Sequence, residues 1–133
     1  MMKLKNKNLL INKCYVNGTW ISSNKKIKVI NPATGELIVE VPDFGKKETV
    51  NAIDAAEHAF KTWSKFTAHE RSKILKKWYD LVIDNQDDLA MIMTAEQGKP
   101  LSEAKGEIIY AANFIEWFAE EAKRVYGDVL PDP

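Results

Sequence analysis

Residues 37–63 read LIVEVPDFGKKETVNAIDAAEHAFKTW, and within this stretch the spacing of the apolar side chains changes. Leu37, Val39 and Val41 lie two residues apart, which is the period of a β-strand. After Gly45 the apolar residues lie three or four apart, which is the period of an amphipathic helix, at Val50, Ile53, Ala56, Phe60 and Trp63. The sequence therefore predicts a change from strand to helix near Gly45.

The residues before this boundary carry the signals of short strands joined by turns. Asn17-Gly18 lies between aromatic and aliphatic residues, and both residues tolerate the positive φ angles of a tight type I′ hairpin turn. The β-branched residues 27–30 are followed by NPATG, which places Asn, Pro and Gly at turn spacing. Residues 10–44 are therefore predicted as a strand-rich segment, and Pro42 ends its last strand.

The residues after the boundary predict about four helices. Thr67 and Glu70 match a capping box at the start of the second helix. The predicted buried face of that helix consists of Ile74, Leu75, Trp78, Leu81 and Val82. A third, shorter helix is expected over residues 86–97, because Gly98 suits a left-handed cap and Pro100 prevents simple continuation.

The fourth helix completes the expected fold. Ser102 is a suitable N-cap for it, and Gly127 marks its end. The fold class is therefore α+β, with an N-terminal hairpin and strands followed by helices over residues 45–127. No repeat or linker divides the sequence, so we expect one incomplete unit of residues 1–133.

The composition excludes several classes of partner. The 133 residues contain 19 Lys+Arg and 19 Asp+Glu, so the chain lacks the basic excess of a nucleic-acid binder. The apolar run at residues 9–11 is shorter than the core of a secretory signal. No run approaches the roughly 20 apolar residues of a membrane span. We therefore expect a cytoplasmic protein with neither nucleic acid nor membrane as partner.

None of the reactive side chains forms a catalytic constellation. Cys14 is the only cysteine, and it lies at the entry to the predicted hairpin rather than at a helix N-terminus, where thiols are activated. His58 and His69 lie on different predicted helices, and zinc requires three or four ligands. The six glycines form neither of the common phosphate-binding loops. The residues alone therefore predict no catalytic and no cofactor-binding residue.

The fourth predicted helix is apolar on more than one face. Tyr110, Phe114 and Trp117 form one stripe, and Ile115 and Phe118 belong to another. A helix that is apolar on two faces requires partners on two sides. Two interpretations remain open: the stripes belong to a core and an interface, or one stripe lines a ligand cavity.

Several stretches resemble the amino-terminal portion of the aldehyde dehydrogenase superfamily. They are YVNGTW at residues 15–20, VINPATGE at 29–36 and AEQGKPL at 95–101. MTAEQGKP at 93–100 and EIIYAANFIEWFAEE at 107–121 resemble the succinate-semialdehyde dehydrogenase branch in particular. The resemblance covers nearly the whole chain. It implies that the chain forms part of the α/β dinucleotide-binding and oligomerisation region of such an enzyme.

The resemblance implies NAD(P)-dependent oxidation of an aldehyde to a carboxylic acid. In this family a cysteine attacks the aldehyde, hydride passes to the nicotinamide of NAD or NADP, and a glutamate activates the water that hydrolyses the thioester. The segments that hold these groups have no counterpart in the 133 residues, and Cys14 does not match the catalytic motif. We therefore expect this chain alone to bind no cofactor and to oxidise no aldehyde.

The resemblance also assigns two sets of residues. In several members of the family, backbone carbonyls just before Asn-Pro and an acidic residue before x-Gly-Lys-Pro bind a monovalent cation. The corresponding residues here are Val29, Ile30 and Glu96. The fourth helix borders the substrate tunnel in the family. This assigns tunnel-lining roles to Tyr110, Phe114 and Trp117.

The expected partners follow from the same resemblance. In the family the early hairpin joins a sheet used in subunit assembly, and the helices pack on the dinucleotide-binding domain. We therefore expect this chain to associate with copies of itself or with a carboxy-terminal aldehyde dehydrogenase chain. The alternative is a non-catalytic self-assembly or interaction module derived from the family, which the doubly apolar fourth helix favours.

Overall fold

The computed structural model describes residues 2–127 and contains four helices and four short strands. In chain order the elements are a 3-10 turn (Lys7–Leu9), β1 (Cys14–Val16), β2 (Thr19–Ile21), β3 (Lys26–Ile30), β4 (Leu37–Pro42), α1 (Lys46–Trp63), α2 (Ala68–Asp84), α3 (Gln86–Gln97) and α4 (Leu101–Glu121). The predicted α+β arrangement is confirmed, and α1 begins directly after Gly45. The predicted unit of residues 1–133 extends beyond the described residues at both ends.

The strands form two separate antiparallel hairpins. β1 pairs with β2 across a turn in which Asn17 has φ 49° and Gly18 φ 78°, as the predicted type I′ turn requires. β3 pairs with β4, with a register shift between Val29 and Ile30. In the turn between β3 and β4, the Asn31 side chain accepts hydrogen bonds from the backbone N–H groups of Ala33 and Thr34. This asparagine therefore stabilises the turn locally.

Local capping explains where α2 begins and where α3 ends. Thr67 accepts a hydrogen bond from the Glu70 backbone, and Glu70 accepts one from the Thr67 backbone, which confirms the capping box. Gly98 ends α3 in the left-handed conformation with φ 76°. These predictions succeeded because each depends on residues within one helical turn.

Both predicted ends of α4 were wrong. The N-cap is Pro100, whose φ of −55° already suits a helix, so Ser102 lies inside the first turn and caps nothing. The helix ends at Glu121, well before Gly127. The Ala122 N–H still donates four residues back, to Phe118. The chain then tightens, because the N–H groups of Lys123 and Arg124 donate three residues back, to the carbonyls of Glu120 and Glu121.

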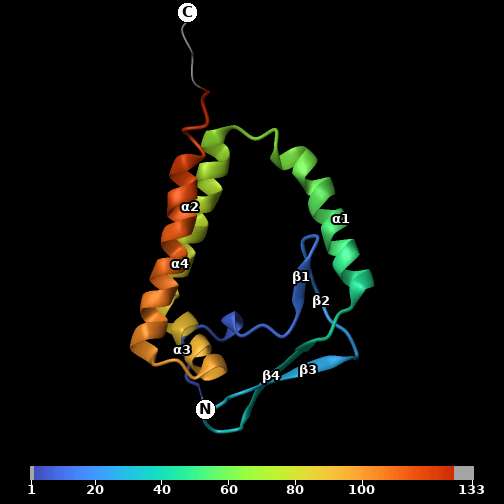
Figure 1. The fold of residues 1–133 in the computed structure, drawn as a ribbon, viewed down its shortest axis with the longest axis vertical. Coiled ribbons are helices and arrows are strands. Elements are labelled where there is room, and N and C mark those ends of the chain that lie inside the picture. Colours follow the sequence, from blue (N-terminus) through green and yellow to red (C-terminus); the bar gives the residue numbers. More distant parts are fainter. Residues whose placement is uncertain (1, 128–133) are drawn as a thin grey trace, which may run out of the picture.

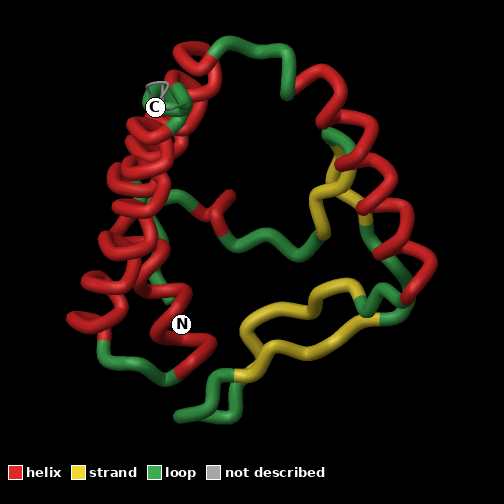
Figure 2. Tube along the Cα trace, turned by 45° about the horizontal axis from the view of Figure 1, so that its top comes forward, coloured by secondary structure: helices red, strands yellow, loops and turns green. Residues whose placement is uncertain are grey.

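The helices pack around α4, while α1 stands apart (Figures 1 and 2). α2 lies along α4, and α3 packs against the first half of α4. Among the described residues, α1 makes no extensive contact with another helix or strand, and no residue of α1 is buried. The residues that are buried in the described fold are small or polar, namely Pro42, Ala90, Ala104, Ala112, Ala119, Ser72 and Asp88.

The predicted buried face of α2 was wrong for three of its five residues, since only Leu75 and Val82 are partly covered. Ile74, Trp78 and Leu81 are each about half exposed, whereas Ser72 is buried and Leu75 is half-buried. The apolar band on α2 is wider than one neighbouring helix can cover. α4 covers only the side that carries Ser72, so the remaining apolar side chains face outward.

The exposed surface is larger than a compact fold of this size allows. A compact monomer of 15.1 kDa exposes about 7,100 Å², whereas this chain exposes 10364 Å². The seven residues outside the described part account for at most about 1,100 Å² of this in any conformation. The described fold therefore leaves substantial apolar surface uncovered.

The helices do not suggest a membrane span. Within residues 2–127, none combines the length and the apolar character needed to cross a bilayer.

Candidate functional site

The outward face of α4 carries an aromatic groove. It has a volume of about 420 Å³ and is lined by Tyr110, Asn113, Phe114, Trp117 and Phe118. Tyr110 and Phe114 stack edge to face with ring centroids 5.0 Å apart. All four aromatic side chains are at least half exposed. The structure thus brings the three predicted tunnel-lining residues together on one face, where their rings can contact an apolar molecule or surface.

The sequence assigned Phe118 to the other stripe of α4, and the structure corrects this. Phe118 is 58% exposed and lies on the aromatic groove. The inward face is built instead from Ala104, Ala112 and Ala119, which are fully buried. Small side chains at this spacing let α4 approach its neighbours closely. This separates α4 into a packed alanine face and an uncovered aromatic face.

The two parts of the predicted cation site flank one close contact. Gly98, at the C-terminal end of α3, approaches Pro32 so closely that a Cβ on Gly98 would lie 3.2 Å from Pro32 Cγ. Ile30 is two residues before Pro32, and Glu96 is two residues before Gly98. The end of a helix also carries a partial negative charge from its free carbonyl groups. Carbonyl and carboxylate oxygens are the donors that hard cations prefer.

A polar contact joins this corner to α4. Lys99 forms an ion pair with Glu107, and the hydrogen bond that Lys99 donates to this carboxylate raises the pKa of Lys99. Lys99 follows Gly98 directly, so the pair ties the α3–α4 connection to the second turn of α4.

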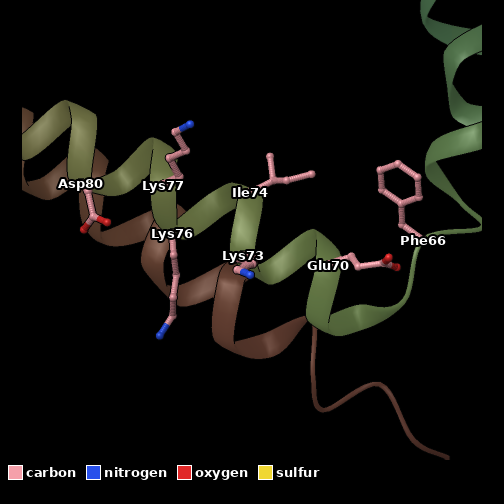
Figure 3. A pocket seen from close by; sticks show the side chains of 7 residues that line it. All are labelled: Phe66, Glu70, Lys73, Ile74, Lys76, Lys77 and Asp80. Atoms are coloured by element: carbon pink, nitrogen blue, oxygen red, sulfur yellow. The ribbon is translucent and has the colours of Figure 1, made fainter.

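A second groove lies on the outer face of α2 and was not predicted from the sequence. Its volume is about 630 Å³, and Figure 3 shows its lining residues Phe66, Glu70, Lys73, Ile74, Lys76, Lys77 and Asp80. The side chains follow helical spacing, which is the signal that could have revealed it. Three lysines and two carboxylates share this exposed surface, so the groove has mixed charge and no buried polar anchor.

The residues that the sequence set aside remain scattered. Cys14 lies in β1, His58 in α1 and His69 in α2. Within the described part of the chain, no three His, Cys, Asp or Glu side chains come together as metal ligands. Gly98 follows a helix and Gly106 lies inside α4, so neither glycine belongs to a strand–loop–helix phosphate cradle.

Comparison with known proteins gives consistent matches. The family model "Aldehyde dehydrogenase family" matches residues 20–133. The chain is 58% identical to the glutarate-semialdehyde dehydrogenase of Pseudomonas putida, covering 98% of this chain and 28% of the relative. It is 54% identical to the NADP(+) succinate-semialdehyde dehydrogenase of Escherichia coli K12, covering 98% of this chain and 27% of the relative.

The fold also matches that of a solved aldehyde dehydrogenase structure. The crystal structure of an aldehyde dehydrogenase from Brucella melitensis biovar abortus 2308 superposes with a TM-score of 0.96 and 56% sequence identity. The match covers 100% of this chain and 28% of that chain. The chain thus spans little more than a quarter of the length of the proteins it matches, and it lies in their amino-terminal region. Because motifs, fold and family model agree, the chain belongs to the aldehyde dehydrogenase family.

Proposed function

We propose that this chain is the amino-terminal portion of a dehydrogenase that oxidises a short aldehyde carrying a carboxylate at its other end. The observation that supports this most directly is the high identity to two relatives, whose names specify glutarate semialdehyde and succinate semialdehyde. Both molecules are aldehydes of dicarboxylic acids. The electron acceptor in the whole enzyme is NAD or NADP, and the Escherichia coli relative favours NADP.

In this proposal the 133 residues supply structure rather than chemistry. The bound nicotinamide supplies the hydride acceptor, and the groups that attack the aldehyde come from elsewhere in the enzyme. This chain contributes helices and hairpins whose apolar faces cover the rest of the enzyme. The excess of exposed surface supports this role. Alone, the chain oxidises no aldehyde, and its cellular location is the cytoplasm.

A chimera tests this function. Its first 133 residues are this chain, and its remainder is the carboxy-terminal part of the Pseudomonas putida relative. We expect aldehyde-dependent NAD(P)H formation by the chimera, and none by this chain alone or by the remainder alone. Cys14→Ser in the chimera should leave the rate unchanged, because Cys14 has no catalytic role here. A pure 133-residue chain that reduces NAD(P) with aldehyde would overturn the proposal, as would a folded but inactive chimera.

The predicted cation site is part of the same proposal. Val29 and Ile30 provide backbone carbonyls and Glu96 a carboxylate, and a monovalent cation there joins the end of β3 to the end of α3. We expect thermal stability in sodium or potassium chloride to exceed that in tetramethylammonium chloride at equal ionic strength. The difference should shrink in Glu96→Gln and persist in Glu103→Gln, which alters a carboxylate on α4 instead. Equal stability of the wild type in all three salts would refute the site.

The aromatic groove is proposed to line the path of the aldehyde. Tyr110, Phe114 and Trp117 line one groove on the exposed face of α4, and an apolar wall there would contact the carbon chain of the substrate. In the active chimera, Phe114→Ala should change the ratio of kcat/KM for glutarate and succinate semialdehyde, since these differ by one methylene. Ile74→Ala, which removes an exposed apolar side chain on α2, should leave the ratio unchanged.

The alternative function is a non-catalytic assembly module, and the uncovered aromatic face of α4 favours it. In that case the chain binds further copies of itself without a carboxy-terminal partner. Two measurements together distinguish the module from the enzyme: the sedimentation of the pure chain at tens of micromolar, and the activity of the chimera. Stable oligomers combined with an inactive chimera would support the module, whereas an active chimera supports the enzyme.

A further inference from the structure

The amino-terminal arm, residues 3–13, is attached to α3 by the carboxylate of Asp88. This side chain lies on α3 but does not cap that helix. Asp88 is only 3% exposed and lies in the first turn of α3. Its two oxygens accept hydrogen bonds from the backbone N–H groups of Lys5 (3.0 Å) and Asn6 (2.7 Å). α3 has no side-chain cap hydrogen bond. The buried carboxylate therefore serves the arm, more than 80 residues away in the sequence.

Neighbouring side chains extend this contact to α4. Asp87 forms ion pairs with Lys5 of the arm (3.1 Å) and with Lys105 of α4 (2.7 Å). The hydrogen bonds from these lysines, that of Lys105 first, lower the pKa of Asp87. Gln86 donates a hydrogen bond to the backbone carbonyl of Lys105. The arm, α3 and α4 thus meet at one polar corner, of which only the Asp88 carboxylate is buried.

The arm leads directly into the β1–β2 hairpin. From the α3 corner the chain crosses to the hairpin, which lies on the α1 side of the molecule (Figure 1). In the described structure β1 and β2 pair with each other and make no extensive contact with another helix or strand. The position of the hairpin therefore depends strongly on where the arm is held.

We infer that Asp88 is a latch, whose buried carboxylate holds the main chain at Lys5 and Asn6 on the α3–α4 corner and thereby fixes the position of the β1–β2 hairpin. The latch recognises backbone N–H groups, so it is insensitive to the arm's side chains. Carboxylate bonds to backbone N–H groups are among the stronger hydrogen bonds, and a buried carboxylate left without its donors is costly. Opening the latch frees the arm and the hairpin while α2 and α4 stay packed.

Amide hydrogen exchange tests the latch at two atoms. In the wild type the amides of Lys5 and Asn6 should exchange at least about tenfold more slowly than in an unstructured peptide of the same sequence. Asp88→Asn should abolish the protection of at least one of these amides, because its side chain keeps one acceptor oxygen and turns an NH2 group toward the other backbone N–H. Asp87→Asn, the matched control, removes only the exposed ion pairs and should retain the protection. Lys5→Ala should retain it too.

The outcome remains decisive even if Asp88→Asn does not fold. Wild-type exchange at Lys5 and Asn6 as fast as in the free peptide would refute the latch without any variant. If the variant folds, as judged by protected amides in α2 and α4, then retained protection at Lys5 and Asn6 would also refute it. Trypsin gives a second readout, since the Lys5–Asn6 bond lies within the latch and its cleavage should be about tenfold faster in Asp88→Asn.

The effect on the hairpin is measured at Cys14. This residue lies in β1, is partly exposed and is the only cysteine, so a nitroxide spin label attaches there selectively. The label should be immobilised in the wild type and in Asp87→Asn, and mobile in Asp88→Asn. A label that is equally mobile in all three proteins would show that the latch does not fix the hairpin.

Discussion

Gly98 shows how one residue serves both a helix end and a contact between segments. Its φ of 76° is the left-handed conformation that closes α3, and a side chain there disfavours this conformation. The absent Cβ also leaves room for Pro32, which lies in the turn between β3 and β4. The left-handed conformation and the close contact with Pro32 both disfavour a side chain at residue 98, so this position tolerates only glycine well.

Gly98→Ala should lower the free energy of unfolding by about 1–2 kcal/mol because of the left-handed conformation, and the close contact with Pro32 adds to this. Gly106→Ala is the matched control. Gly106 lies inside α4, where a Cβ meets nothing within 4 Å, so alanine should stabilise the chain by about 0.5–1 kcal/mol. Thermal unfolding followed by circular dichroism measures both. Shifts of the same sign would contradict the prediction.

Residue-scale features were predictable where the cause is local. The Asn17-Gly18 turn, the Thr67 cap and the Gly98 cap each depend on a few neighbouring residues, and the sequence predicted all three. Asp88 was not predicted, because its partners Lys5 and Asn6 lie 83 and 82 residues away. A carboxylate in the first turn of a helix is already explained by its favourable interaction with the helix dipole. The sequence therefore gives no reason to expect a partner far along the chain.

At the scale of elements, α2 begins with a complete capping box. Thr67→Ala removes the side-chain oxygen that accepts from Glu70, and should destabilise the chain by about 1 kcal/mol. The bonds from Thr67 also lower the pKa of Glu70, so part of the effect should disappear in acid, as Glu70 becomes protonated. Thr62→Ala, within α1, should be neutral or slightly stabilising. Urea denaturation at two pH values compares them, and equal effects at both positions would contradict the prediction.

The α2–α4 pair carries a pH-dependent link. Lys123, and across the helix pair Lys76, lower the pKa of Glu120 from 4.5 to about 2. Because the folded pKa lies below the unfolded one, the link contributes fully above about pH 4.5 and is lost as the pH falls toward 2. Glu120→Gln should therefore lower the urea midpoint at pH 6 and have less effect near pH 2.5.

Salt and a second carboxylate provide the controls for this link. The ion pairs are exposed, so the difference at pH 6 should diminish in 1 M salt. Glu57→Gln changes a carboxylate of α1 that takes part in none of the ion pairs of the described residues, and should have little effect at either pH. A Glu120→Gln effect that grows toward pH 2.5 would contradict the assigned direction.

Helix periodicity predicted which elements form but not which faces are covered. The stripe Ile74–Trp78–Leu81 satisfies the pattern of a buried face, yet these side chains are about half exposed. Periodicity reports that a face is apolar and does not report what lies against it. The covered side of α2 carries Ser72, which no hydrophobic pattern would select.

At the scale of the whole molecule, the exposed apolar area dominates. The chain exposes 10364 Å², and the uncovered aromatic side chains on α4 form one concentrated apolar surface. Patches of this kind mark contact surfaces in soluble proteins. The pure chain is therefore expected to associate at tens of micromolar.

Trp117→Gln should weaken this association. Trp117 lies at the aromatic groove and is 60% exposed, so its removal reduces apolar contact without disturbing the alanine face of α4. We expect a lower weight-average mass in sedimentation at equal concentration. Glu116→Gln introduces the same side chain one residue earlier and should leave the mass unchanged. A wild type that sediments as a compact monomer would contradict the prediction directly.

The candidate site was predictable only in part. Spacing alone grouped Tyr110, Phe114 and Trp117, and the structure adds Phe118 to the groove. The proximity of the β3–β4 turn to the end of α3 depends on tertiary structure, and only the family resemblance pointed to it. The α2 groove was missed because its lysines have an equally good explanation as a solvated helix face.

The small alanine core also determines the heat capacity of unfolding. This quantity follows the apolar area exposed on unfolding, and compact proteins show about 12–15 cal/mol/K per residue. A chain whose apolar faces are already solvent-exposed in the folded state has less apolar area left to expose on unfolding. Its heat capacity of unfolding per residue should therefore lie below this range, and its free energy of unfolding should vary little with temperature. Association of the chain buries these apolar faces, so it should carry a large negative heat-capacity change. The enthalpy of association should therefore become steeply more negative on warming.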